Sequence, residues 1–321
     1  MLDKFKYNLY RLKYRYGRQL PLKAPVDISF ELNSNCNMSC KYCYHGALTK
    51  LPFTKGYMNI DLAKDILLQA ADLGVHSFKP NFRGESTMHP RYTEILLAGK
   101  SLASGSTFID RITNSNFKIP WKVREDKFIG LASLTKVKVS YDSFDKGVFE
   151  TQRAGGNHDL TTENIDLFYN HPARIKSETE IVIQAVRTLL NKDEDIEGMA
   201  KKRWPEASIS IRDMVEGRTD NDLEDLTNKT RDLTNRRPCL QASVRMIIHH
   251  DGRVAPCCPS YKSNLFIGKF PDKNLSEIFN GYLAKKLRKE LKNKKAFNNY
   301  EACKNCSSFE SYKGFKPSWS S

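Results

Sequence analysis

Residues 26–214 alternate between short apolar runs and longer amphipathic segments, as expected of repeated strand–helix units. The run at 26–32 predicts a buried strand, and 60–74 predicts a helix that ends at the C-cap residue Gly74. Further strands are expected over 76–82, 107–113, 137–143, 178–186 and 207–214, with helices over 91–103, from about 121, near 161–170 and near 193–202. Six strands separated by helices imply parallel order. We therefore predict an α/β fold, a partial (β/α)6 TIM-like barrel with its active residues at the C-terminal ends of the strands.

The pattern changes after the sixth strand. A β-hairpin is expected over 244–258, turning at Asp251-Gly252, and a basic helix over 275–291, whose charged face we expect to be solvated. The polar stretch between the barrel and the hairpin predicts a linker. The chain then divides into an N-terminal helix (1–25), a barrel (26–215), a linker (216–236) and a small C-terminal domain of hairpin and helix (237–321).

The first 25 residues predict a basic amphipathic helix. Apolar side chains recur at helical spacing at Leu2, Phe5, Leu9, Leu12 and Tyr16, and seven Lys/Arg accompany one acidic residue. Such a helix either packs its apolar stripe on the barrel and exposes its charges, or lies on an anionic membrane or grips a phosphate-rich ligand. We expect the packed arrangement.

Composition narrows the class of protein. The chain has 321 residues, 40% of them apolar, which suffices for a sizeable core, and it has no run of 18 apolar residues. Eight cysteines without an export signal indicate the cytosol, where thiols serve as ligands or catalysts. The net charge of +15 favours an acidic partner such as a nucleotide, a phosphorylated metabolite, an acidic peptide or an anionic surface. No recognition motif supports nucleic acid.

The cysteines fall into two groups. Three lie within eight residues as Cys36-x3-Cys40-x2-Cys43, and the others are Cys239, Cys257, Cys258, Cys303 and Cys306. Two metal sites on separate segments are therefore expected. The first group directly follows the first strand, at the mouth of the predicted barrel. Three thiolates can hold three irons of a [4Fe–4S] cube and leave the fourth iron open. The alternatives are three unrelated thiols or a zinc site, for which the nearest fourth ligand is His45.

The first group resembles the signature of the radical S-adenosylmethionine (SAM) superfamily, CxxxCxxC with an aromatic residue, here Tyr42, before the last cysteine. The resemblance implies that SAM chelates the open iron. It also implies a GGE-like turn after the second strand that receives the SAM amino group. Here that turn is Arg83-Gly84-Glu85, with arginine in place of the first glycine.

Two further elements carry the resemblance. A Ser-x-Asp after the fourth strand, which in the family addresses the ribose and carboxylate of SAM, corresponds to Ser140-Tyr141-Asp142. The family's Arg-Gly-Gly corresponds to Arg153-Ala154-Gly155-Gly156, with one residue inserted. Taken singly, Glu85 and Asp142 would read as solvated loop carboxylates. The likeness covers about residues 26–306, and its implied cofactor-binding residues are Tyr42, Gly84, Glu85, Ser140, Asp142 and Arg153.

The second cysteine group resembles the shortened "Twitch" form of the SPASM extension, which binds one auxiliary [4Fe–4S] cluster. Between Cys239 and Cys257 lie 17 residues, and 45 more precede Cys303-x2-Cys306. The implied ligands are these four cysteines, with Cys258 as an alternative to Cys257. A four-cysteine zinc ribbon has compatible spacing and stays open.

The resemblance implies a reaction. The four-cysteine spacing is closest to the SAM-dependent alcohol dehydrogenase of aminoglycoside biosynthesis. It implies that a 5′-deoxyadenosyl radical abstracts hydrogen from a polar or anionic small molecule, which is oxidised at a sugar or cyclitol alcohol, with the auxiliary cluster as electron acceptor. An external one-electron donor such as flavodoxin or ferredoxin is implied too.

Other functions remain open. One is a peptide-modifying maturase, although about 25 residues before the first strand are too few for a peptide-recognition domain. Another is a zinc-stabilised scaffold without catalysis. Arg212 and Asp213, after the sixth strand, are candidate substrate contacts or a surface ion pair, and His249 and His250, beside the hairpin turn, are expected to be solvated.

Overall fold

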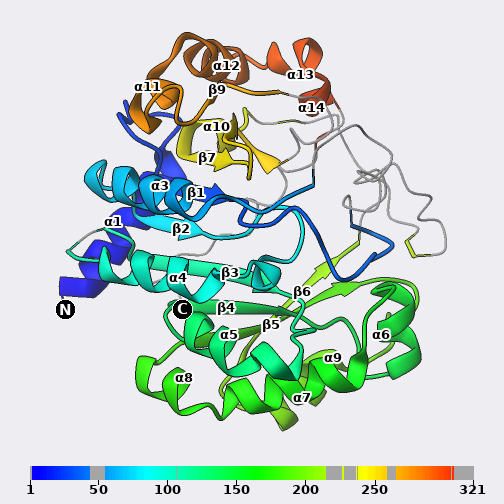
Figure 1. Cartoon of the computed structure of the whole chain (residues 1–321). Coiled ribbons are helices and arrows are strands. Elements are labelled where there is room, and N and C mark those ends of the chain that lie inside the picture. Colours follow the sequence, from blue (N-terminus) through cyan, green and yellow to red (C-terminus); the bar gives the residue numbers. More distant parts are fainter. Residues whose placement is uncertain are drawn as a thin grey trace.

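The protein is described by a computed structural model that covers residues 2–43, 55–105, 107–214, 226–227, 236, 238–258, 265–304 and 306. Six parallel strands lie in sequence order across one sheet (Figure 1). They are β1 (Asp27–Phe30), β2 (Ser77–Lys79), β3 (Asp110–Ser115), β4 (Lys136–Ser140), β5 (Glu180–Arg187) and β6 (Ser208–Asp213). The predicted α/β class and partial barrel are confirmed.

The helices between the strands cover one face of the sheet. They are α3 (Ile60–Asp72), α4 (Tyr92–Ser101), α5 (Arg124–Leu131), α6 (Lys146–Gln152), α7 (His158–Tyr169), α8 (Pro172–Ser177) and α9 (Ile196–Arg203), with 3-10 turns η1 (Ser86–Met88) and η2 (Trp121–Val123). Val137 and Val139 of β4 enter the core on this face, beside Phe128 of α5 and Phe168 of α7. The short helices α6 and α8 lack an apolar period long enough to predict them.

Strand side chains alternate between faces, so those next to the core residues point the other way. Lys136, Lys138 and Ser140 of β4 therefore share the face away from the covering helices, and we call it the inner face of the sheet. The register places Asp27 of β1 and Ser77 of β2 side by side on it. The barrel stays open at β6, the edge strand.

The C-terminal hairpin continues the same sheet. β7 (Arg245–Ile248) pairs in parallel with β1, and β8 (Arg253–Ala255) and β9 (Gly268–Lys269) follow in antiparallel order. The predicted turn at Asp251-Gly252 is confirmed. Gly252 has φ +83°, and a Cβ there would lie 2.0 Å from the Phe270 carbonyl oxygen, so the turn requires glycine. The hairpin thus lies beside the strand that leads into the first cysteine group.

Short helices complete this region: α10 (Gln241–Val244), α11 (Leu275–Asn280), α12 (Tyr282–Lys292), α13 (Ala296–Asn299) and α14 (Glu301–Lys304). The single helix predicted over 275–291 is wrong in one respect, because the backbone is extended at Gly281 (φ −68°, ψ 166°) and separates α11 from α12. α12 buries Ala284, Leu287 and Leu291 and leaves its basic side chains on the other side, as expected. The predicted linker falls almost wholly outside the described residues.

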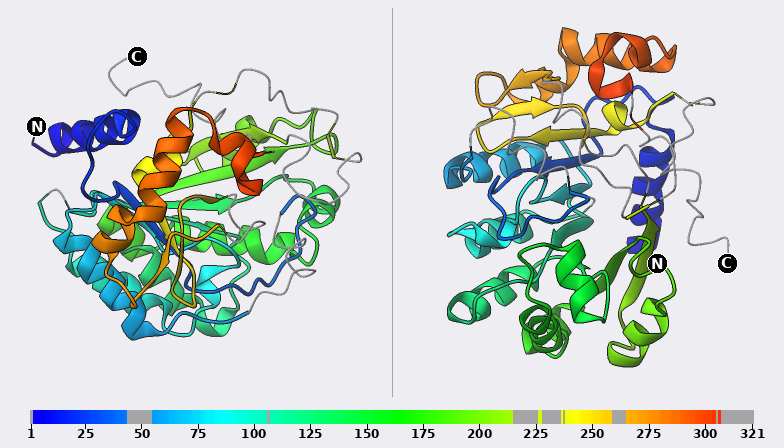
Figure 2. Two further views of the ribbon diagram at one scale, coloured as in Figure 1. Left: turned by 90° about the horizontal axis from the view of Figure 1, so that it is seen from above. Right: turned by 90° about the vertical axis from the view of Figure 1, so that its right-hand side faces the viewer.

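The N-terminal helix α1 (Leu2–Tyr16) lies across the inner side of the sheet, opposite the helices that follow the strands (Figure 2). It packs there, but through a tyrosine face: Tyr10 is buried and its hydroxyl lies 3.5 Å from Asp110 Oδ2. The predicted apolar stripe is wrong as the packing face, because Phe5 is 67% and Leu12 46% exposed. The helix packs through its tyrosine face because polar groups on the strands provide hydrogen-bond partners for the tyrosine hydroxyls. In the described part of the chain, no helix has the length and apolar character to cross a membrane.

Candidate active site

The loop carrying Cys36, Cys40 and Cys43 begins at the C-terminal end of β1. Its backbone pairs with the segment around Arg153: Ser39 N donates to Ala154 O (2.7 Å) and Lys41 N to Gln152 O (3.1 Å). The Arg-Ala-Gly-Gly element of the sequence is therefore the support on which the cysteine loop rests.

A lysine fastens the same two segments together. Lys118 Nζ donates to the carbonyl oxygens of Asn37 (3.2 Å) and Gly155 (2.6 Å), and Asn116 Nδ2 donates to Asn37 Oδ1 (2.7 Å). The sequence contained no motif for Lys118 or Asn37, because these bonds join segments about 80 residues apart. The loop is thus pre-organised by the protein itself.

Asp142, Arg153 and Tyr42 form one buried cluster beside Cys40. Arg153 Nη2 and Nε lie 3.0 Å from the two Asp142 oxygens, Tyr42 donates its hydroxyl to Asp142, and Arg153 Nη1 lies 3.9 Å from Cys40 Sγ. Val186 N also donates to Asp142 (2.9 Å). Burial opposes the charged form of Arg153, but Asp142, together with Tyr42 and Cys40, outweighs it and raises the pKa of the guanidinium. The carboxylate of Asp142 is consequently engaged with internal partners.

The Arg83-Gly84-Glu85 turn packs against the backbone that leads into Cys36. Gly84 has φ +67°, and a Cβ there would lie 2.3 Å from the Asn35 carbonyl oxygen and 2.5 Å from that of Asn33. Glu85 N donates to Asn35 O (2.8 Å). Only glycine fits this position.

Glu85 itself is buried. Its carboxylate accepts from Asn116 N (2.8 Å) and from Thr87 Oγ1 (2.8 Å). Burial raises the pKa of Glu85, and these hydrogen bonds only partly offset it. Glu85 also contributes, after burial, to the raised pKa of Cys36, so the two side chains lie near one another.

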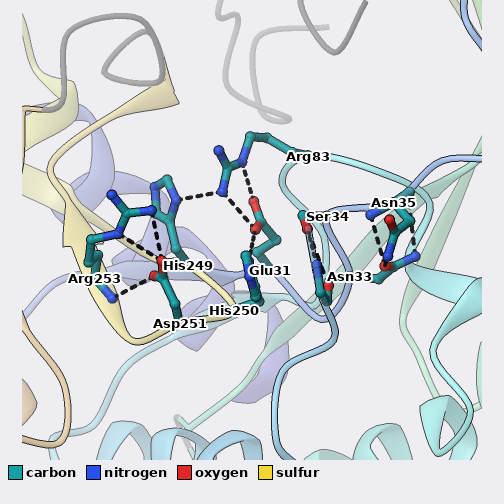
Figure 3. Close-up of polar contacts among 10 residues, drawn as sticks. Glu31, Asn33, Ser34, Asn35, Arg83, His249, His250, Asp251 and Arg253 are labelled. Carbon is teal, nitrogen blue, oxygen red and sulfur yellow. Dashed lines mark hydrogen bonds and ion pairs between the residues drawn. The ribbon is translucent and has the colours of Figure 1, made fainter. Parts of the chain in front are cut away.

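Arg83 occupies the place where the family pattern has glycine, and it has partners of its own (Figure 3). Its guanidinium binds Glu31 through Nε (2.5 Å) and Nη2 (2.8 Å), and Nη2 also lies 2.8 Å from His249 Nδ1. His250 Nδ1 lies 2.8 Å from Glu31. Although burial would raise it, His250 and Arg83 hold the pKa of the Glu31 carboxyl below its usual value. This network joins the ends of β1 and β2 to the C-terminal hairpin.

The expectation that His249 is solvated is wrong. Its side chain is 1% exposed and packs between the rings of Phe82 and Phe266. Burial lowers the pKa of His249 to about 4. His250 is also largely shielded, through its contact with Glu31. The predicted hairpin is present, but no residue pattern near it indicates that its turn lies against β1 and β2.

The remaining candidates at the strand ends are separated by strand alternation. Ser140 shares the inner face with Lys138, at the end of β4. Arg212 and Asp213 are neighbours on β6, so their side chains point to opposite faces. The register places Arg212 on the inner side, since it pairs with Val186, which shares a face of β5 with Val182, the partner of Lys138. Asp213 is therefore not positioned to share a ligand with it.

The cysteines of the first group are partly buried. Burial raises the pKa of Cys36 to about 12 and that of Cys40 to about 11, the latter against the lowering effect of Arg153. Each of these cysteines also feels the charge of Cys43. Three sulfur donors on one loop, with no carboxylate ligand among them, suit an iron–sulfur cluster. His45, the candidate fourth zinc ligand, lies outside the described residues.

The second cysteine group lines a pocket with an empty volume of about 460 Å³ beneath α12 and α14. Burial, and then the charges of Cys239, Cys303, Cys306 and Cys258, raise the pKa of the Cys257 thiol, so these sulfurs lie within electrostatic reach of it. The pocket is otherwise apolar, lined by Leu265, Leu287, Leu291 and Phe297. Within the described ranges, no three His, Cys, Asp or Glu side chains are grouped tightly enough for a single metal ion.

Cys258 lies apart from that pocket. Its Sγ accepts from Arg245 Nη1 (3.6 Å), and Arg245 in turn is ion-paired with Asp27 on the inner face (2.9 Å). Adjacent residues on the hairpin thus direct their thiols to different surroundings.

Comparison with known proteins agrees with this geometry. Residues 239–307 match the SPASM family, described as an iron–sulfur cluster-binding domain. No curated protein resembles the chain closely enough in sequence to count as a relative.

Solved structures share the fold. SuiB of Streptococcus suis bound to S-adenosylmethionine is 16% identical (TM-score 0.64, covering 88% of this chain and 72% of SuiB). BtrN in complex with AdoMet and 2-DOIA is 18% identical (TM-score 0.55, 88% and 93%). The enzyme anSMEcpe with bound AdoMet and Cp18Cys peptide is 15% identical (TM-score 0.57, 89% and 87%). The expected resemblance is confirmed in the fold, which the chain shares with structures solved with bound S-adenosylmethionine, and in the SPASM match of its C-terminal residues.

Proposed function

We propose that this chain is a radical SAM enzyme that oxidises a polar small molecule, with a sugar or cyclitol alcohol as the substrate class. The observation that carries the proposal is the loop of Cys36, Cys40 and Cys43, packed against both the Gly84-Glu85 turn and the Arg153 segment. In this reading the three cysteines hold a [4Fe–4S] cluster. When bound, that cluster and SAM supply a 5′-deoxyadenosyl radical that takes a hydrogen atom from the substrate.

The residues of the chain then have distinct tasks. The buried Glu85, at the turn facing the cysteine loop, receives the SAM amino group, and Ser140 at the end of β4 contacts its ribose. Glu85 accepts from the neutral donors of Asn116 and Thr87, whereas Asp142 is ion-paired with Arg153, so the task of Asp142 is to position Arg153 and Tyr42 against the cysteine loop. Tyr42 and Arg153 support the loop rather than substrate.

The C-terminal pocket is proposed to be a Twitch-type site with one auxiliary [4Fe–4S] cluster held by Cys239, Cys257, Cys303 and Cys306. Four thiolates leave no vacant iron, so the cluster suits electron transfer rather than substrate binding. When bound, the auxiliary cluster supplies the electron acceptor for the oxidation. A flavodoxin- or ferredoxin-type protein delivers the first electron.

A peptide substrate is the second candidate function. SuiB has been solved with its precursor peptide SuiA, on a fold that covers 93% of this chain (TM-score 0.64, 15% identity), and anSMEcpe with a peptide. BtrN, by contrast, was solved with the small molecule 2-DOIA. We favour the small molecule because the four-cysteine spacing of this chain most resembles that of the SAM-dependent alcohol dehydrogenase.

Anaerobic reconstitution followed by iron and sulfide analysis tests the proposal. We expect about eight irons in the unmodified chain, about four in a Cys239→Ala/Cys257→Ala variant, and 5′-deoxyadenosine from both after SAM and a reductant are added. Zinc without sulfide would overturn the proposal in favour of a binding scaffold. Loss of two mass units from a cyclitol would support the proposed oxidation. A modified or crosslinked peptide product would instead identify the chain as a peptide-modifying maturase.

A further inference from the structure

The inner face of the sheet carries more cationic side chains than its carboxylates pair with. Asp27 binds both Lys79 Nζ (2.8 Å) and Arg245 Nε (2.9 Å), and Lys136 Nζ is paired with Glu180 (2.9 Å). Lys138 and Arg212 share this face without such a partner. Among the described residues, neither is engaged in a hydrogen bond or an ion pair.

Lys138 is the more informative of the two because it is half-buried. It sits in the middle of β4, next to Asn114 on β3 and Val182 on β5. Burial, and then the charges of Lys79, Arg212 and Lys136, lower the pKa of its amine to about 8, against the opposite effect of Asp110. A shielded ammonium surrounded by cations is unfavourable unless an anion joins them.

The position of Lys138 relates it to the proposed reaction site. It precedes Ser140 by two residues on the same face, which is about 6.6 Å along a strand. Ser140 lies at the C-terminal end of β4, where SAM is proposed to bind. A substrate held at Lys138 would therefore extend from the interior of the barrel toward the SAM end.

We propose that Lys138, with Arg212 on β6, binds an anionic oxygen group of the substrate, a phosphate or a carboxylate, on the inner face of the sheet. The inference rests on the proposed function in taking this face as the substrate site. The charge of Lys79 adds to the positive potential at this site, but Lys79 does not contact the anion because it is ion-paired with Asp27. The substrate class becomes a polar molecule that carries one anionic group away from its reacting carbon.

Competitive chemical labelling of the reconstituted protein tests this without turnover. Trace acylation at pH 8, with mass spectrometry, reports the reactivity of each lysine, first in chloride and then with inorganic phosphate or acetate at equal ionic strength. An anion that raises the pKa of Lys138 by one unit lowers its neutral fraction at pH 8 from about a half to about a tenth, so labelling slows roughly fivefold. Lys136, ion-paired on the same strand and face, is the internal control and should not respond.

The two probes distinguish the two chemistries: protection by phosphate alone indicates a phosphate ester, and protection by acetate indicates a carboxylate. A Lys138→Met variant should bind the effective probe at least tenfold more weakly in a direct titration, whereas Lys138→Arg and Lys136→Met should retain it. Equal labelling of Lys138 in chloride, phosphate and acetate would overturn the inference.

Its failure differs from failure of the proposed function. Formation of 5′-deoxyadenosine without protection of Lys138 would leave a radical SAM enzyme whose substrate is not anionic. Protection of Lys138 without 5′-deoxyadenosine would leave the anion site and remove the radical chemistry.

Discussion

Asp142 and Arg153 form a buried ion pair that contacts the cysteine loop and supports it. The carboxylate stands at the end of β4, the guanidinium follows α6, and Arg153 reaches Cys40 Sγ at 3.9 Å. Neither side chain has appreciable contact with solvent. A buried charge pair of this kind is costly to break on one side and much less costly to remove as a pair.

We predict strong coupling between these two residues. Asp142→Asn should reduce the free energy of unfolding by about 3 kcal/mol, since it leaves the Arg153 charge buried without a counter-charge. Arg153→Met should cost a similar amount. The double variant should be clearly more stable than the sum of the two losses, as measured by anaerobic urea denaturation of the reconstituted protein.

Iron content supplies a second measurement on the same variants. Because the Arg153 side chain packs against the Cys40 thiol, each single variant should lose iron from the first site while the auxiliary site stays filled. If the losses of unfolding free energy in the two single variants add up in the double variant, and all variants keep their full iron content, the pair does not support the loop.

A substitution at Gly84 tests the packing of the Arg83-Gly84-Glu85 turn. Gly84→Ala would place a Cβ 2.3 Å from the Asn35 carbonyl oxygen, so the turn or the segment before Cys36 has to move. Gly74 is a matched control, since it has the same φ of +67° and nothing within 4 Å of its added Cβ. Gly74→Ala should cost about 1 kcal/mol for its backbone conformation, and Gly84→Ala at least about 2 kcal/mol more.

The two glycine variants should also differ in SAM affinity. We expect Gly84→Ala to weaken binding, measured by equilibrium titration of the reconstituted protein, and Gly74→Ala to leave it unchanged. Equal affinity in the two variants would mean that the turn at Gly84 does not form part of the SAM site.

The auxiliary site can be tested with neighbouring cysteines. Cys257 lines the pocket with Cys239, Cys303 and Cys306, whereas Cys258 accepts a hydrogen bond from Arg245. Cys257→Ala should therefore lower the iron content of the reconstituted protein by up to about four, and Cys258→Ala should leave it near eight. Loss of iron in the Cys258 variant alone would reverse the assignment.

Sequence patterns predicted those parts of the molecule that depend on local spacing. The three cysteines, the Asp251-Gly252 turn and the six strands each follow from residues within about ten positions of one another. Pairings over long distances were not predictable in this way. Nothing near residue 245 indicated that β7 would add in parallel to β1, because that choice depends on which sheet edge is free in the folded chain.

Two features that local patterns do not explain have the same physical origin. The apolar stripe predicts the wrong packing face of α1, because the helix packs through tyrosines whose hydroxyls contact Asp110 and Arg245. Arg83 departs from the glycine of the family's turn, and it is matched by Glu31 and His249, 52 and 166 residues away. Polar partners of this kind are visible only after the strands are placed side by side.

His249 links this network to the pH dependence of stability. Burial lowers its pKa to about 4, whereas the unfolded chain should have the ordinary value of about 6.5. Between these values the unfolded chain binds a proton that the folded protein does not, so stability falls as the pH falls through this window. From pH 7.5 to 5.5 the expected loss from His249 is about 1.3 kcal/mol.

A His249→Gln variant should lack this component while its amide oxygen still accepts from Arg83. The variant can be less stable than the unmodified chain at pH 7.5, but its stability should decline less between pH 7.5 and 5.5, by about 1.3 kcal/mol. Parallel urea denaturation series at both pH values measure the difference. Identical declines would mean that His249 is protonated alike in the folded and unfolded chains, and its burial between Phe82 and Phe266 would then not control its charge.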